Sequence, residues 1–262
     1  MTSGTEPLAW PSVPATDAAA TGALLLLSAT ELEVEPLAAG LSPTADNAGL
    51  PEAWRVRHGQ VAGVPCVHLA TGVGKANAAA ATALALRALR PGAALLVGVG
   101  GAFAGAGLEP GDVALAASET HLDSGVGHGE AWQGLEELGF PTLPAGGARS
   151  APLYNRLPLG DHVARLATAL QLPALPFGTA EAVTADAATA ARLAERHGVA
   201  VESMEGAAVA QVALAFGVPL VELRGVSNLV GERDKRRWRL TEAVARSCAA
   251  ARRAAELLME GR

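Results

Sequence analysis

Val64 to Leu89 read VPCVHLATGVGKANAAAATALALRAL, and this stretch decides the fold. It begins with a mostly apolar run of strand length, which ends in a turn at Gly72 and Gly74. From Lys75 to Arg90 the chain is rich in alanine and leucine, and the Pro-Gly pair that follows is a typical helix stop. The stretch therefore predicts a buried strand, a glycine turn and a helix in succession.

The same alternation continues on both sides of this unit. Short runs of Val, Leu and Ala predict strands, and longer alanine-rich segments predict helices. The predicted strands lie in 22–29, 93–105, 111–118 and 219–228, and the predicted helices in 184–198, 202–217 and 241–261. Strands that alternate with helices along a whole chain predict an α/β sheet covered on both faces. In such sheets ligands bind at the carboxyl ends of strands, so we expect the site in the loops TELEVE, TGVGK, VGVGGAF and RGVSNLVGERD.

Composition limits the kind of protein this can be. The 262 residues, 50% of them hydrophobic, suffice for one large domain at 22–262. Residues 1–21 lack the basic segment and apolar core of a secretory signal and are expected to be a disordered leader. A net charge of −6 without basic clusters argues against nucleic acid or an anionic membrane surface as partner. No apolar run reaches the roughly 18 residues that cross a bilayer.

The two cysteines point to a reducing compartment. Cys66 and Cys248 are far apart, and no Cys/His spacing of a metal site occurs. The glycine loops fit neither GxGxxG nor GxxxxGK[ST], so tight strand–helix packing explains them better than a nucleotide cofactor does. We therefore expect a cytoplasmic protein without metal or cofactor.

Several polar residues interrupt the apolar pattern where strands end or helices begin. Glu31, Glu33 and Glu35 follow the first strand; they could serve a helix dipole, or one could be a general acid or base. Met204 and Glu205 begin a helix, where a carboxylate can accept two ribose hydroxyls while the thioether covers the sugar. Further polar side chains lie at the end of the last strand and in the loop after it: Arg224, Asn228 and the charged residues of ERDKRRW. A buried Arg224 needs a partner, either a carboxylate such as Glu222 or Glu33 or an anion or water at a site.

Taken in order, SATELEVEPL, TGVGKANAA, VGVGGAFAG, VESMEGAAVAQ and LRGVSNLVG resemble the nucleoside phosphorylase and nucleosidase family, particularly its hydrolases. Within it, RGVSNLVGERD is most similar to the branch that hydrolyses futalosine. The resemblance implies one three-layer αβα domain with a central twisted mixed sheet. It also implies a small nucleoside substrate and a homo-oligomer.

The resemblance also implies roles for individual residues. Glu33 matches the acidic residue that activates water, and Arg224 matches an arginine near that water. Met204 and Glu205 match the ribose-binding pair. Residues of EAVTAD take the place of the base-stacking segment, so Ala182 and Val183 are expected to line the purine, with Val99 and Gly100 beside the substrate.

Two departures from the family indicate the substrate and the nucleophile. Adenine-specific members carry Asp where this chain has Asn228; an amide can donate to a 6-oxo group and accept from a protonated N7, which favours hypoxanthine. Val99 lies near the position where phosphorolytic relatives supply a hydroxyl to phosphate, and valine has no donor. Water is therefore the expected nucleophile.

The charged run ERDKRRW directly follows the predicted base loop. It could be a solvated helix start, or it could bind the benzoate of the futalosine branch's substrate, with Arg233, Arg236 or Arg237 on the carboxylate and Trp238 on the ring. The alternatives for the whole chain are a phosphorylase of 6-oxopurine nucleosides, a methylthioadenosine-type nucleosidase and a nucleoside-binding module without catalysis.

Overall fold

The computed structural model describes residues 23–43, 47, 49–146 and 149–259. The predicted leader at 1–21 therefore lies outside the described residues. Ten strands form one sheet: β1 (Leu24–Ser28), β2 (Leu41–Pro43), β3 (Val56–Val61), β4 (Val64–Ala70), β5 (Ala93–Ala102), β6 (Val113–His121), β9 (Arg156–Pro158), β10 (Ala174–Thr179), β11 (Val201–Ser203) and β12 (Leu220–Leu229). A separate hairpin pairs β7 (Gly125–Val126) with β8 (Gln133–Gly134).

Six α-helices and three 3₁₀ helices connect these strands. They are α1 (Lys75–Leu89), α2 (Leu135–Leu138), α3 (Asp161–Leu170), α4 (Ala187–His197), α5 (Gly206–Phe216), α6 (Leu240–Met259), η1 (Glu31–Gly40), η2 (Gly129–Ala131) and η3 (Lys235–Arg237). The strand, glycine turn and helix predicted for Val64–Leu89 are confirmed as β4 and α1. Within the described residues, no helix is long and apolar enough to cross a membrane.

The sheet is mixed, as predicted. Its strand order is β11-β10-β6-β12-β5-β1-β4-β3-β2, with β9 on the side of β6. The pairs β4–β1, β1–β5 and β5–β12 are parallel, whereas β12–β6 and β3–β4 are antiparallel. The sheet curls until β11 also pairs with the end of β5, so that five strands close into a ring. This closure brings loops from distant parts of the sequence to the end of β5.

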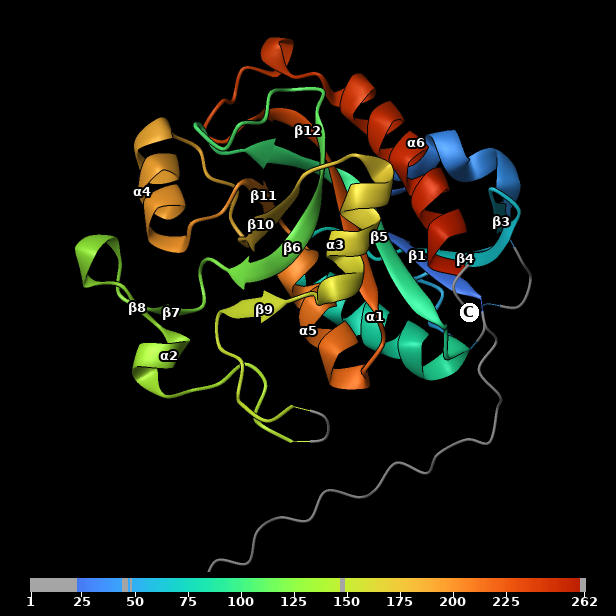
Figure 1. Ribbon diagram of the computed structural model, residues 1–262, viewed down its shortest axis with the longest axis horizontal. Coiled ribbons are helices and arrows are strands. Elements are labelled where there is room, and N and C mark those ends of the chain that lie inside the picture. The colour runs from blue at the N-terminus through green and yellow to red at the C-terminus, as the bar shows by residue number, and fades with distance from the viewer. Residues whose placement is uncertain (1–22, 44–46, 48, 147–148, 260–262) are drawn as a thin grey trace, which may run out of the picture.

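Two pairs of helices cover the sheet (Figure 1). Helix α1 packs on α5, and α3 packs on α6, which also lies along β12 and β5. Ala78, Ala81 and Ala85 of α1 and Ala207 and Ala210 of α5 are fully buried. Because alanine is small, these helices can approach each other and the sheet closely enough to fill a core poor in aromatic residues. The buried leucines of β1 and the buried run Ala93–Val97 of β5 form the centre of that core.

Candidate active site

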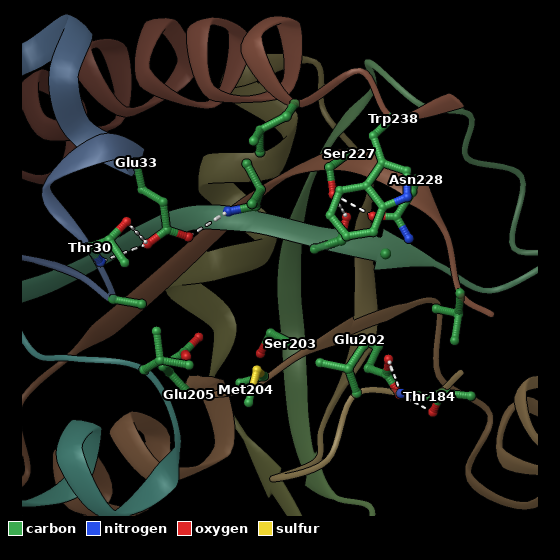
Figure 2. Close-up of a pocket in the computed structure, with 18 of the residues that line it drawn as sticks. Thr30, Glu33, Thr184, Glu202, Ser203, Met204, Glu205, Ser227, Asn228 and Trp238 are labelled. Atoms are coloured by element: carbon green, nitrogen blue, oxygen red, sulfur yellow. Dashed lines mark hydrogen bonds between the residues drawn. The ribbon is translucent and has the colours of Figure 1, made fainter. Parts of the chain in front are cut away.

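A cavity of about 290 Å³ opens where the central strands end. Its wall includes residues that follow β1, the end of β5, the end of β11 and the end of β12. These are the carboxyl ends of the parallel strands β1, β5 and β12, so the loops predicted from the strand pattern do meet at one place. Figure 2 shows Glu33 and Glu205 at one end of this pocket and Asn228, Glu202 and Thr184 at the other.

Glu33 is held in place by the start of η1. Its carboxylate accepts from the backbone N–H of Thr30 at 3.0 Å, which forms a capping box, and from the backbone N–H of Val99 at 3.1 Å. The side chain lies in the pocket wall but is only 7% exposed. Burial raises the pKa of Glu33, although the nearby Arg224 and these N–H donors oppose the shift. A raised pKa makes the ionised carboxylate a stronger base, which suits it to accept a proton.

Arg224 lies beneath the pocket and not in its wall. Its guanidinium is fully buried, with Nη1 3.8 Å from Glu33 Oε1 and Nη2 3.5 Å from Glu205 Oε2. Its Nε donates to Glu222 at 2.8 Å. The carboxylate partners expected for a buried arginine are therefore present. The resemblance predicted an arginine beside the attacking water, whereas Arg224 lies behind Glu33 and Glu205 and does not line the pocket. Burial alone would lower the pKa of Arg224, yet the three carboxylates raise it overall, so the group stays charged.

Gly98 allows this arrangement. A Cβ at residue 98 would lie 2.5 Å from both Arg224 Nη1 and Glu33 Oε1. Any side chain there would collide with the ion pair. The ion pair therefore requires a glycine at this position of β5. Gly98 is the first glycine of VGVGGAF, one of the loops in which the sequence predicted the site.

Another buried carboxyl, Glu119, belongs to the same polar cluster. It accepts from the hydroxyl of Thr179 at 2.8 Å and lies beside Glu222, and a Cβ at Gly206 would meet carboxyl oxygens of both glutamates. Burial, followed by the Glu222 charge, raises the pKa of Glu119 well above its ordinary value. Burial and the Glu222 charge thus favour the neutral form of Glu119.

Glu205 caps the start of α5 and faces the pocket. Its Oε1 accepts from the backbone N–H of Gly74 at 3.0 Å, and the residue is 4% exposed. Met204 lines the pocket next to it. The predicted Met-Glu pair thus lies on the same side of the pocket as Glu33, within reach of one small ligand.

Asn228 faces the pocket because β12 has a bulge. Val226 pairs with Gly100 and Asn228 pairs with Gly101, so Ser227 is an extra residue in the strand. The single proton of the Ser227 hydroxyl lies between two acceptors, Asn228 Oδ1 at 2.7 Å and Gly100 O at 3.1 Å, and Asn228 Nδ2 donates to Leu229 O at 2.8 Å. These bonds fix the orientation of the amide. One N–H and one lone pair of the amide remain for a ligand.

The structure separates the other predicted residues into two groups. Val99, Gly100, Val183, Arg233 and Trp238 line the pocket. Ala182 is exposed and does not line it, because the chain turns inward only at Val183 and Thr184. Arg237 is also outside it: its side chain is 72% exposed and pairs with Glu232. The structure therefore places Ala182, which was expected to line the purine, and Arg237, which was one of three candidates for the benzoate carboxylate, outside the pocket wall.

Among the pocket residues that the sequence did not single out are Glu202 and Thr184, which both stand in the quoted motifs. Glu202, three residues before Glu205, is 6% exposed and lies in the pocket wall. The hydroxyl of Thr184 and its N–H, at 3.2 Å, both donate to the Glu202 carboxylate. The sequence did contain a signal for Glu202, because this acidic residue lies between Val201 and Ser203 in the short apolar stretch before Met204.

Comparison with known proteins agrees with this fold and site. The family model described as the phosphorylase superfamily matches residues 23–260. The chain therefore belongs to the phosphorylase superfamily. Among its members, the futalosine hydrolase of Thermus thermophilus is 39% identical over 231 residues, covering 87% of this chain and 93% of that protein. The futalosine hydrolase of Streptomyces coelicolor is 39% identical over 183 residues, covering 68% of this chain and 73% of that protein.

Solved structures show the same fold. The methylthioadenosine/S-adenosylhomocysteine nucleosidase of Neisseria meningitidis, bound to methylthio-immucillin-A, superposes with a TM-score of 0.74 at 21% identity. It covers 90% of this chain, which in turn covers 99% of it. The futalosine hydrolase of Helicobacter pylori has a TM-score of 0.71 at 16% identity over 91% of this chain and 97% of its own.

Proposed function

We propose that this protein is a futalosine hydrolase, which cleaves the N-glycosidic bond of futalosine with water and releases hypoxanthine. The observation that carries the proposal is the pairing of Glu33 and Glu205 at one end of the pocket with an oriented amide, Asn228, at the other. Relatives of that name at 39% identity support it.

In the proposed reaction, Glu205 accepts hydrogen bonds from the 2′- and 3′-hydroxyls of the ribose, and Met204 covers the apolar face of the sugar. These contacts place C1′ near Glu33. Ionised Glu33 orients a water molecule and takes its proton as the water oxygen bonds to C1′. The C1′–N9 bond breaks, and its electron pair leaves with the purine, whose N7 takes up a proton from solvent, while the proton that Glu33 accepted returns to solvent.

Asn228 stabilises the departing base. Its remaining N–H donates to O6, and its remaining lone pair accepts from N7–H. A 6-aminopurine presents a donor where O6 would be, so one polar group would be left unpaired. Such a mismatch costs about 1–3 kcal/mol, or roughly tenfold to hundredfold in rate.

Arg224 acts in this scheme as a positioning residue. It holds Glu33 and Glu205 from below through its two terminal nitrogens. Because its charge favours the ionised form of Glu33, it keeps the base active, while burial keeps the pKa of Glu33 above its ordinary value.

Water is favoured over phosphate because carboxylates occupy the backbone donors of the glycine loops. Gly74 N–H bonds Glu205 and Lys75 N–H bonds Glu181, so the start of α1 offers these amides to no anion. Val99 N–H bonds Glu33. The Lys75 ammonium is paired with Asp123. A phosphate at this end would face several carboxylates in a confined space.

The benzoate of futalosine requires a cation, and Arg233 is the best candidate. It lines the pocket and lies over the Trp238 ring at 5.2 Å, and it makes no ion pair with any described residue. Arg236 is bound to Asp234 and Arg237 to Glu232, so both are already neutralised. We therefore propose Arg233 for the carboxylate and Trp238 for the ring.

We also propose that the enzyme works as a homo-oligomer in the cytoplasm, with 22–262 as its catalytic domain. Leu32, Val73 and Val183 line the pocket yet are 55%, 49% and 43% exposed. An apolar pocket rim of this kind gains from cover by a second chain. Light scattering on the purified protein tests this, and a monomer at all concentrations would contradict it.

One assay tests the proposed reaction. The protein is incubated with futalosine, inosine and methylthioadenosine, with and without phosphate, and the released base is followed by chromatography. We expect hypoxanthine from futalosine at a rate independent of phosphate. Release only in the presence of phosphate would identify a phosphorylase, adenine from methylthioadenosine as the main product would identify the other nucleosidase class, and binding of nucleosides without release of any base would identify a binding module.

A further inference from the structure

Glu202 is a buried carboxylate in the pocket wall that the proposed reaction does not use. It is 6% exposed and is held by two donors of one residue, the N–H and the hydroxyl of Thr184. These bonds fix its direction but leave one lone pair free on each oxygen. A buried carboxylate that keeps free lone pairs toward a cavity calls for a donor from a ligand.

Glu202 and Asn228 flank the same residue of the sheet. Gly101 of β5 pairs with Glu202 of β11 on one side and with Asn228 of β12 on the other. Neighbouring strands lie about 4.8 Å apart, so the two flanking backbones are roughly 10 Å apart with Gly101 between them. A Cβ on Gly101 would come within 3.4 Å of Asn228 Nδ2. A Cβ there would also meet Val230 Cγ2 at 3.1 Å, so the glycine keeps the space beside the amide free of a side chain. Figure 2 shows the side chains of Asn228 and Glu202 at the same end of the pocket.

The edge of a 6-oxopurine fits such a pair. N7, O6 and N1–H follow one another along it, so the edge presents an acceptor at O6 and a donor at N1. An amide that contacts N7 and O6 leaves N1–H, on the other side of O6, without an acceptor. A 6-aminopurine instead has a lone pair on N1, which an ionised carboxylate would repel.

We propose that the Glu202 carboxylate accepts N1–H of the hypoxanthine base and is, with Asn228, the residue that determines specificity for a 6-oxopurine. This inference rests on the proposed function, because it assumes that Asn228 reads the base. Burial raises the pKa of Glu202, while the Thr184 bonds and the charge of Arg233 oppose the shift and favour the ionised acceptor. Thr184 is a positioning residue for this carboxylate.

The test is Glu202→Gln, assayed on two pairs of substrates that differ only at the base. We expect the ratio of kcat/KM for futalosine over aminofutalosine, and for inosine over adenosine, to fall at least tenfold, because a glutamine amide can also donate to N1 of a 6-aminopurine. The control is Glu195→Gln on the exposed face of α4, which removes one carboxylate charge far from the motif and should leave both ratios unchanged. Unchanged ratios in Glu202→Gln would overturn the inference.

Two further measurements keep the test decisive. Should Glu202→Gln not fold, Glu202→Asp keeps the charge, withdraws it by one methylene, and should lower the same ratios. Calorimetry on the unaltered protein should give at least tenfold tighter binding for hypoxanthine than for 1-methylhypoxanthine, which lacks N1–H; equal affinities would also overturn the inference. If the unaltered protein does not cleave futalosine but prefers inosine to adenosine, the proposed substrate fails, and the Glu202 inference is still decided by the inosine ratio and the free bases.

Discussion

Arg224 Nη1 lies 3.8 Å from Glu33 Oε1, and only a glycine at residue 98 makes room for the contact. The arginine does not reach the pocket, so its effect on a reaction there passes through the carboxylate. The positive charge of buried Arg224 therefore affects the pocket by favouring the ionised form of Glu33.

Glu33→Gln should reduce kcat for futalosine by roughly 10²- to 10⁴-fold, because an amide cannot take a proton from water. The matched control is Glu35→Gln, two residues further along η1, where the side chain is exposed. Hypoxanthine release and circular dichroism should be measured on both variants. Near-normal turnover in folded Glu33→Gln would remove Glu33 from the mechanism.

The pH profile should show the raised pKa of Glu33. Since the base must be ionised, kcat/KM should fall on the acid side with an apparent pKa above the ordinary value of 4.5. The effect on stability has the opposite sign: a raised pKa in the folded state means that this group stabilises the fold below about 4.5 and that the contribution is lost as the pH rises through the folded pKa. Measurements of kcat/KM for inosine between pH 4 and 8 test the predicted fall in activity on the acid side. They should be repeated on Glu202→Gln, where the same fall should remain if Glu33 causes it. A profile that is flat down to pH 4.5 contradicts the prediction.

The buried carboxyls Glu119 and Glu222 should respond differently to the same change. Because burial and the Glu222 charge raise the pKa of Glu119 and so favour its neutral form, Glu119→Gln, which introduces a neutral amide of the same shape, should alter kcat and thermal stability little. Glu222→Gln removes the ion that Arg224 Nε donates to and should destabilise the fold by about 3–5 kcal/mol. Thermal denaturation and turnover of both variants decide the matter. Equal losses would mean that Glu119 carries a charge.

Strand, glycine and helix patterns were sufficient to predict the α/β fold and the loops that form the pocket. They could not give the closure of β11 onto β5, because that pairing depends on the curl of the whole sheet and not on local sequence. The same closure places Glu202 opposite Asn228. Nor could a pattern reveal the bulge at Ser227, which adds one residue without changing the apolar run. Arg224 was recognisable as important, but whether it faces the pocket depends on packing around Gly98.

Asn228→Asp should shift base preference toward 6-aminopurines. In its acid form, aspartic acid can protonate N7 with one oxygen and accept from a 6-amino group with the other, but the oxygen that faces position 6 cannot donate to O6. We expect the ratio of kcat/KM for futalosine over aminofutalosine to fall roughly tenfold to hundredfold. The Ser227 hydroxyl, 2.7 Å from Asn228 Oδ1, can donate to an aspartate in the same way, whereas the bond from Nδ2 to Leu229 O is lost, so circular dichroism should accompany the assay. An unchanged ratio would show that the amide does not contact the base.

Arg233→Ala should distinguish the two ends of the substrate. If its guanidinium holds the benzoate, loss of a charged hydrogen bond should raise KM for futalosine about tenfold to hundredfold. Inosine lacks the benzoate, so its KM should change little. Arg237→Ala is the matched control, since that side chain is exposed and bound to Glu232. Arg233 also lowers the pKa of Glu202, which gives the experiment a second outcome. An equal rise in KM for futalosine and inosine would place Arg233 with the base, acting through Glu202, and would leave the benzoate to a group outside this pocket wall.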